Sequence, residues 1–328
     1  MWRQQMAGLE IRAMETVRQM DVKPGMSVDE LVRAMGGCGF GASRLADAVE
    51  IYQDMVLGDY TKFFALSGAM VPAGMRNIVA QLIRRGMIDV LVTTGANLVH
   101  DIIESISPHH LGSPEAEDAD LREGGLSRIY DVYLSDEQFI QFEDLMQGII
   151  PAHGDPVSGT AFLHQLGSRI DDENSILATA ESCNVPVFCP ALTDSMIGLQ
   201  AWLFRQTRPL RLDLLADVKE IVDICYRAEK AGIMIVGGGV PKNFSLQSML
   251  VTPHNFQLAV QLTTDHPEAG GLSGATLSEA ISWGKLSAQA RYVTVYGDAT
   301  INLPLLVAAV LTRMEERISE EDRSQRCD

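Results

Sequence analysis

Short apolar runs alternate along this chain with longer stretches whose apolar positions recur at helical spacing. Two runs, at residues 63–68 and 89–95, each precede a helix-like stretch, at 72–86 and 96–107. Apolar runs of this length are typical of strands buried on both faces, and helices form the crossovers that parallel strands require. The pattern therefore predicts an α/β fold with a parallel sheet.

Four more apolar runs continue this pattern in the second half of the chain. They lie at residues 186–192, 232–239, 256–263 and 292–298. Together the runs predict a Rossmann-like, largely parallel sheet of about six strands with helices on both faces. Glycines or small polar residues follow the runs, and such residues suit ligand-binding loops at the carboxyl ends of parallel strands.

Outside this alternation the pattern is less regular. It predicts a small β excursion at 127–134, a solvated acidic loop at 113–125, and further helices at 44–55, 136–150, 159–170 and 303–318. Residues 1–36 read as a polar, helical N-terminal extension, and residues 319–328 as a frayed, charged tail. No repeat or low-complexity linker divides the chain, so we expect a single domain over residues 1–328.

The composition narrows the class of protein. The chain has 328 residues, of which 46% are hydrophobic and 21% charged, so it can bury a large core. We expect no membrane span and no signal peptide, because the apolar runs are short. Five scattered cysteines without a CxxC pair indicate reduced thiols in a cytoplasm. The net charge of −17 argues against nucleic acid and anionic membranes, and weakly favours a cationic small molecule.

The stretch at residues 270–285 reads as a site. A glycine-rich loop opens into a helix-like run that Thr276 or Ser278 could cap, with Glu279 in its first turn. The run ends in Ser-Trp-Gly followed by Lys285. An indole and a carboxylate nearby suggest a lysine partly removed from water, and desolvation favours the neutral amine that can form a Schiff base. A solvated surface lysine is the alternative that local sequence leaves open.

A second candidate site gathers at the predicted carboxyl ends of the strands. Three glycines at residues 237–239 follow one strand, where backbone without side chains could approach a pyrophosphate or ribose closely. Ser67, Thr94 and Asp298 follow other strands. Several small polar strand ends on one edge favour a nucleotide site, although the glycines lack the GxGxxG spacing and could form only a tight turn. No metal-ligand spacing is present, so we expect no metal.

Five segments resemble one known family. SEAISWGK at 278–285, followed by YVTVYGDATINLPLL at 292–306, is similar to the C-terminal signature of deoxyhypusine synthases. LVTTGANLVHD at 91–101, PVFCPALTDSMIG at 186–198 and IVGGGVPKNF at 235–244 fit the same family. The resemblance runs in unbroken order from about residue 37 to residue 314. The residues of these motifs are most similar to those of the bacterial deoxyhypusine synthase-like branch.

The resemblance implies a reaction, a cofactor and an assembly. A hydride would pass to NAD from the carbon bearing the secondary amine of a polyamine, and Lys285 would capture the resulting imine. An acceptor amine would then displace Lys285 and the hydride would return. Trp283 would wall the pocket and Glu279 would pair with a substrate ammonium. A homo-oligomer, a tetramer of paired dimers with sites at the dimer interface, is implied. The implied NAD contacts are Ser67, Thr94, Gly95, Asp194, Gly238, Gly239, Thr264, Asp298 and Ala299.

Four positions depart from the family pattern. Leu199 and Leu272 stand where aspartates are expected, Asn243 where a histidine is expected, and His100 where a glutamate is expected. A leucine cannot hold an ammonium. Since each charge-assisted contact contributes roughly 1.5–3 kcal/mol, two missing contacts would weaken spermidine binding by more than about a hundredfold. All but His100 are expected to line the substrate site.

These departures shape the preferred hypothesis. It is an NAD-dependent transferase that moves a 4-aminobutyl group from a polyamine to an amine acceptor in polyamine synthesis. The alternatives are a true deoxyhypusine synthase that modifies a translation-factor lysine, and a non-catalytic protein that binds NAD and polyamine.

Overall fold

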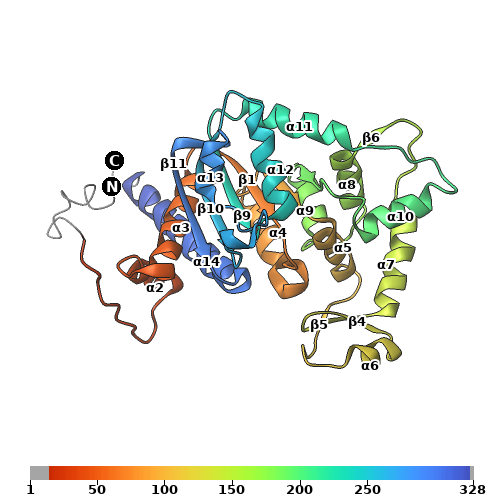
Figure 1. Cartoon of the computed structure of the whole chain (residues 1–328), viewed down its shortest axis with the longest axis horizontal. Helices are drawn as coiled ribbons and strands as arrows, with labels where there is room; N and C mark the ends of the chain where they lie inside the picture. Colours follow the sequence, from red (N-terminus) through yellow and green to blue (C-terminus); the bar gives the residue numbers. More distant parts are fainter. Residues whose placement is uncertain (1–14, 326–328) are drawn as a thin grey trace.

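The computed structural model describes residues 15–325, and within them a parallel sheet of six strands forms the centre of the molecule (Figure 1). The strand order is β11-β10-β9-β1-β2-β7, and every neighbouring pair is parallel. The predicted sheet is therefore confirmed. Its strands are β1 (Thr61–Leu66), β2 (Val90–Thr93), β7 (Val187–Phe188), β9 (Ala231–Val236), β10 (Phe256–Thr263) and β11 (Leu286–Tyr296).

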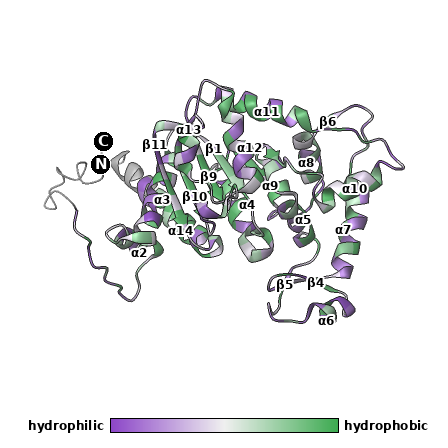
Figure 2. Ribbon diagram, in the orientation of Figure 1, coloured by the Kyte–Doolittle hydropathy of each residue, from purple (hydrophilic) through white to green (hydrophobic). Residues whose placement is uncertain are grey.

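Helices cover both faces of the sheet, because the strands are apolar on both sides. In β1, Phe63 and Ala65 belong to one buried cluster, and Phe64 and Leu66 to another. Figure 2 shows these central strands as mostly hydrophobic. The first cluster is covered by α11 (Leu214–Arg227), α12 (Gly239–Leu250) and α13 (Leu277–Ser282). The second is covered mainly by α3 (Phe40–Leu57), α4 (Arg76–Arg84), α5 (Gly95–Glu104), α9 (Ile176–Ser182) and α14 (Ala299–Gln325).

The middle of the chain forms a smaller unit beside the main sheet. Strands β3 (His110–Leu111), β5 (Val132–Ser135) and β4 (Leu126–Ile129) make an antiparallel sheet, which confirms the predicted β excursion. The acidic stretch expected to be a loop contains the short helix α6 (Asp118–Glu123). The remaining elements of this region are α7 (Asp136–Ile149), β6 (Val157–Ser158), α8 (Gly159–Gly167), α10 (Met196–Phe204) and β8 (Leu212–Asp213).

The chain differs from the expected pattern near its ends and before α4. Helix α2 covers only Val28–Met35, capped by Ser27, whereas residues 15–26 form no helix. These residues lack an apolar stripe that could pack against the core, and they are exposed almost throughout. A turn at Pro24 and Gly25 also interrupts them. Helix α14 extends to Gln325, which makes most of the expected tail helical. A π-helical turn η2 (Val71–Met75) precedes α4. Residues 1–14 and 326–328 of the expected end segments lie outside the described residues.

The order of the strands positions the candidate site. From β1 the chain moves outward to β2 and β7, and then returns to the other side of β1 to add β9, β10 and β11. The direction of winding therefore reverses between β1 and β9. Ligands of open α/β sheets bind outside the carboxyl ends of the strands at such a point.

Candidate active site

The loops after β1 and β9 are locked together at this reversal. The Ser67 hydroxyl donates to the carbonyl of Val236 over 2.9 Å and accepts from the backbone N–H of Gly238 over 2.7 Å. Gly237 has a φ of +74°, and a Cβ there would lie 2.6 Å from Ser67 Oγ. The glycines are thus required by this close contact, and the Ser67 hydroxyl serves the backbone.

A cavity of about 460 Å³, named here the inner cavity, opens above these loops. The amino ends of α5 and α12 both border it, and two helix amino ends offer free N–H groups and a positive dipole to an anion. It brings together five of the nine expected cofactor-binding residues: Ser67, Thr94, Gly95, Asp194 and Gly239.

Asp194 reaches the inner cavity because two loops meet closely there. A Cβ on Gly95 would lie 2.3 Å from Cβ of Ser195, so the start of α5 touches the loop that carries Asp194. The cap of α10 is Ser195, whose hydroxyl accepts from the N–H of Gly198 over 3.2 Å. Asp194 is exposed and is not needed for that cap, which leaves its carboxylate available to a ligand.

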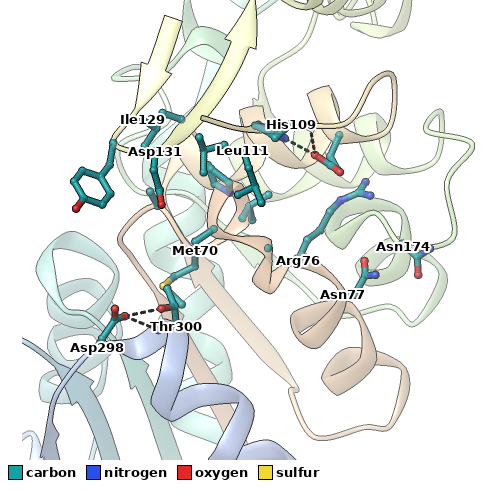
Figure 3. A pocket seen from close by; sticks show the side chains of 18 of the residues that line it. Met70, Arg76, Asn77, His109, Leu111, Ile129, Asp131, Asn174, Asp298 and Thr300 are labelled. Carbon is teal, nitrogen blue, oxygen red and sulfur yellow. Dashed lines mark hydrogen bonds and ion pairs between the residues drawn. The ribbon is translucent and has the colours of Figure 1, made fainter. Parts of the chain in front are cut away.

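A second cavity of about 850 Å³, named here the outer cavity, adjoins the first (Figure 3). The two share the lining residues Ala69 and Ile129. Asp298 borders the outer cavity and accepts from the N–H and the hydroxyl of Thr300, over 2.8 and 2.9 Å. Arg76 lines it too, but its guanidinium is paired with Asp101 and Asp172, each at 2.7 Å. The arginine is therefore neutralised by protein carboxylates.

Three expected cofactor residues line neither cavity. Gly238 is not a lining residue, and its backbone N–H donates to the Ser67 hydroxyl. Thr264 is exposed directly after β10, and Ala299 begins α14. Gly238 and Ala299 directly adjoin the lining residues Gly239 and Asp298 in the sequence, whereas Thr264 adjoins none. Contact of these three residues with a cofactor stays a prediction.

Lys285 lies in a third cavity of about 510 Å³, named here the lysine cavity. The capping box of α13 joins Thr276 and Glu279, which confirms Thr276 as one of the two expected caps. Gly284, with a φ of +71°, turns the chain, and the N–H of Lys285 donates to the carbonyl of Ala280 over 2.9 Å. The Lys285 ammonium lies 5.6 Å from the centre of the Trp283 ring, within the range of a cation–π contact.

Lys242 is the most deeply buried lysine among the described residues, and the local sequence did not indicate this burial. It is 4% exposed and donates to Oε1 of Gln261 at 3.1 Å and to the carbonyls of Leu272 and Ala275 at 3.2 and 2.5 Å. Burial lowers the pKa of Lys242 to about 8; the Glu279 carboxylate opposes this shift and the charge of Lys285 adds to it. Its place after Gly-Gly-Gly-Val-Pro was the only sequence signal.

Three of the residues expected to bind substrate, Asn243, Leu272 and Leu199, can be compared with the lining of the lysine cavity. Asn243 and Leu272 both line it, beside Glu279. Leu199 does not, because it lies on α10 and is 51% exposed. Within one chain, then, the structure brings together Asn243, Leu272, Glu279, Trp283 and Lys285 but leaves Leu199 apart.

A chain of three side chains connects the inner and outer cavities. His100 lines the inner cavity, and its Nδ1 lies 2.9 Å from Nε2 of His109. His109 and Glu104 line the outer cavity, where the Glu104 carboxylate contacts Nδ1 of His109 (Figure 3). Sequence reasoning missed His109 and Glu104. His100 and Glu104 share a face of α5 at i,i+4 spacing, but His109 returns to them from a loop.

Comparison with known proteins decides the family. The model of the deoxyhypusine synthase family matches residues 30–310. The chain belongs to the deoxyhypusine synthase family. It is 56% identical over 306 residues to "Probable deoxyhypusine synthase 1" of Methanosarcina mazei, covering 92% of this chain and 96% of that protein. It is 46% identical over 301 residues to the protein of the same name from Archaeoglobus fulgidus, covering 92% and 99%.

A solved structure supports the fold. The crystal structure of a candidate deoxyhypusine synthase from Entamoeba histolytica superposes with a TM-score of 0.63 at 19% identity, over 90% of this chain and 97% of that one. At this identity the likeness shows the fold alone.

Family membership settles the class of chemistry. Deoxyhypusine synthases are NAD-dependent transferases of an aminobutyl group, as the resemblance implied. The curated relatives support the alternative, a true deoxyhypusine synthase, better than the preferred hypothesis of polyamine synthesis. The similarity to a bacterial branch is not confirmed. Across the described part of the chain, no helix combines the length and apolarity needed to cross a membrane.

Proposed function

We propose that this protein is a deoxyhypusine synthase that moves the 4-aminobutyl group of spermidine to a lysine of an acceptor protein. The observation that carries the proposal is the 56% identity to a relative so named, over nearly the full length of both chains. The placement of Lys285 beside Trp283 and Glu279 in one cavity supports the same chemistry.

NAD, when bound, supplies a hydride acceptor that can return the hydride at the end of the reaction. The inner and outer cavities fit such a group, since they offer two helix amino ends and the carboxylates of Asp194 and Asp298. The Lys285 amine attacks the imine carbon of the oxidised spermidine, forms a new C–N bond, and releases the diamine as leaving group. Trp283 stacks on the cationic chain, and the acceptor lysine then displaces Lys285 by the same exchange.

We infer that a second copy of the chain completes the site. Lys285 precedes β11, so its backbone lies at the amino end of the sheet, whereas the inner cavity lies at the carboxyl ends. Helix α12 lines both cavities, with its first turn on the inner cavity and its later turns on the lysine cavity. A homotetramer of paired dimers is proposed, in keeping with the family. An active monomer by light scattering would contradict it.

The test is transfer to protein. The purified enzyme is incubated with NAD, spermidine and a purified translation-factor acceptor, and the acceptor is analysed by intact-mass spectrometry. One added aminobutyl group on a lysine is expected. In a parallel reaction, borohydride should trap an adduct on Lys285 in the wild type. Lys285→Arg should abolish the adduct and the transfer, because arginine cannot become a neutral nucleophile. Lys219→Arg on α11 is the exposed control.

A second candidate, synthesis of a small polyamine, is favoured by one observation. Leu272 and Asn243 line the lysine cavity at positions where the family pattern has an aspartate and a histidine. The side chains that contact the substrate amine therefore differ from those of the family pattern. A screen of small amines as acceptors, with NAD and spermidine, distinguishes the two candidates. A new polyamine formed without any protein modification would favour the second candidate and overturn the first.

A further inference from the structure

The chain Glu104–His109–His100 has a defined direction of hydrogen bonding. The Glu104 carboxylate accepts from the backbone N–H of His109 at 3.0 Å and also contacts Nδ1 of the same residue. An ionised carboxylate can only accept, so the proton of the His109 ring lies on Nδ1. In the neutral ring this leaves Nε2 of His109 as an acceptor.

When the His109 ring is neutral, its hydrogen bonding also assigns the proton of the His100 ring. Nε2 of His109 faces Nδ1 of His100 at 2.9 Å, and one of these two atoms must carry the proton. With His109 accepting, the proton lies on Nδ1 of His100. The lone pair of His100 is then on Nε2, the ring atom that is left free for a ligand. Within the described part of the chain, the hydrogen bonds of the His100 side chain involve Nδ1 only.

The surroundings keep His100 uncharged. Burial lowers the pKa of His100 to about 4; the facing ring of His109 adds to this shift and the Glu104 carboxylate opposes it. Apart from His100, Asp194 is the only ionisable side chain among the described residues that line the inner cavity. The cavity thus presents one carboxylate and one neutral ring, and no cationic side chain, to a ligand.

We propose that Glu104 acts through His109 to hold His100 in the tautomer whose Nε2 accepts a hydrogen bond from an N–H group of the ligand in the inner cavity. The inference rests on the proposed function for the identity of that ligand. Two bound molecules could present the N–H group, the carboxamide of NAD or the amine of spermidine. Glu104 and His109 are positioning residues in this arrangement, and His100 is the residue that contacts the ligand.

The tautomer can be measured without any ligand. Long-range ¹H–¹⁵N correlation spectra of protein labelled at its seven histidines report which ring nitrogen carries the proton. Signals are assigned by comparison with His100→Phe and His109→Phe. At neutral to alkaline pH, His100 is expected to be protonated on Nδ1 and bare on Nε2. Protonation of Nε2 instead would overturn the inference.

Glu104→Gln tests the direction of the chain with almost no change in shape. The glutamine amide can donate to Nδ1 of His109, which would reverse both hydrogen bonds and put the proton of His100 on Nε2. The expected result is a switch of the His100 tautomer in the spectrum. Glu123→Gln, on the exposed end of α6, is the matched control and should leave the tautomer unchanged. An unchanged tautomer in Glu104→Gln would refute the role of Glu104.

Binding measurements by calorimetry identify the source of the N–H group. The first arm compares NAD with its 3-acetylpyridine analogue, in which a methyl group replaces the carboxamide nitrogen. If His100 accepts from the carboxamide, the wild type prefers NAD by roughly five- to tenfold, the effect of one hydrogen bond, and Glu104→Gln and His100→Phe lose the preference. The second arm measures spermidine binding to protein saturated with NADH, where the variants lose a similar factor if the amine is the donor.

The outcomes separate this inference from the proposed function. His110→Asn, an exposed neighbour outside both cavities, is the control and should match the wild type in each arm. Variants that bind both ligands like the wild type would overturn the role of His100. A wild type that binds neither NAD nor spermidine would overturn the proposed function and the ligand contact together, whereas the spectrum of the free protein would still decide the tautomer.

Discussion

The ammonium of Lys242 donates to the backbone carbonyl of Leu272, and the two atoms lie 3.2 Å apart. The same ammonium holds the carbonyl of Ala275, and its partner Gln261 donates to the carbonyls of Gly237 and Ser273, each at 2.9 Å. One buried pair of side chains therefore ties the loop at 272–275 both to α12 and to the glycine turn after β9. This loop forms a wall of the lysine cavity.

Lys242→Met should destabilise the protein by about 1–3 kcal/mol. The substitution fills similar space but leaves three acceptors without their donor, and an unmade buried hydrogen bond has a cost of this size. Urea unfolding at neutral pH measures the change. Lys219→Met on α11, where the ammonium is exposed, is the control and should stay within about 0.5 kcal/mol. Equal free energies of unfolding for Lys242→Met and the wild type would show that these hydrogen bonds do not contribute to stability.

The glycine turn predicts the effect of a second substitution. NAD should stabilise the wild type, by about 2.7 kcal/mol at a hundred times its dissociation constant. In Gly238→Val, a Cβ placed 2.4 Å from Cα of Ser273 forces the loop away, so the thermal shift with NAD should shrink. Asp298→Ala should reduce it too. Gly41→Ala in α3, where a Cβ meets open space, should keep the full shift. No shift in the wild type at millimolar NAD would count against the site.

Acid should weaken the fold through His100. The folded-state pKa of about 4 lies below the ordinary value of 6.5, so between these values the unfolded chain binds more protons. Stability is therefore lost as the pH falls from about 6.5 to about 4, by about 1–3 kcal/mol from this group. Urea unfolding at about pH 7 and about pH 4.5 should show a smaller loss for His100→Gln than for the wild type. His110→Gln should lose as much as the wild type.

The sheet was predictable because each strand is apolar on both faces. The runs at β1, β2, β9 and β10 would leave apolar side chains in water if either face of the sheet were exposed. The helical connections from β1 to β2 and from β9 to β10 favour a parallel arrangement. The loops after these strands were predictable for the same reason, since the carboxyl ends of parallel strands meet at one edge. Residues 15–26 were predicted less well, because polar sequence without an apolar stripe carries little information on whether a helix forms.

Side-chain partners across loops could not be predicted. His109 meets His100 only because the chain after α5 turns back toward that helix, and no spacing rule covers a contact across a loop. Lys242 lies near the start of α12, and no local spacing marks it as buried. Its burial depends on the loop at 272–275, about thirty residues later in the chain. In contrast, Glu279 and Thr276 form a local capping box, which sequence spacing alone can indicate.

Leu272 provides the sharpest test of how the amine substrate is held. Its side chain is 50% exposed and lines the lysine cavity, where Glu279 is the only carboxylate among the described lining residues. Leu272→Asp would add a second anion beside it. Since a charge-assisted hydrogen bond contributes roughly 1.5–3 kcal/mol, spermidine should bind about tenfold more tightly or better, and the gain should fall at high salt. Calorimetry with protein saturated with NADH measures it.

Leu199→Asp separates the effect of one chain from that of an assembly. Leu199 lies on α10, away from the lysine cavity of its own chain, so its substitution should strengthen spermidine binding only if a second copy brings α10 to that cavity. Leu215→Asp, on the exposed start of α11, is the matched control and should change nothing. A double variant, Leu199→Asp with Leu272→Asp, that modifies the acceptor protein less well than the wild type would contradict the prediction that added carboxylates improve spermidine binding. Other carboxylates, with Asp265 and Glu268 as candidates, would then bind the amine. An added aspartate would in that case draw the substrate cation away from its normal position, so transfer would fall.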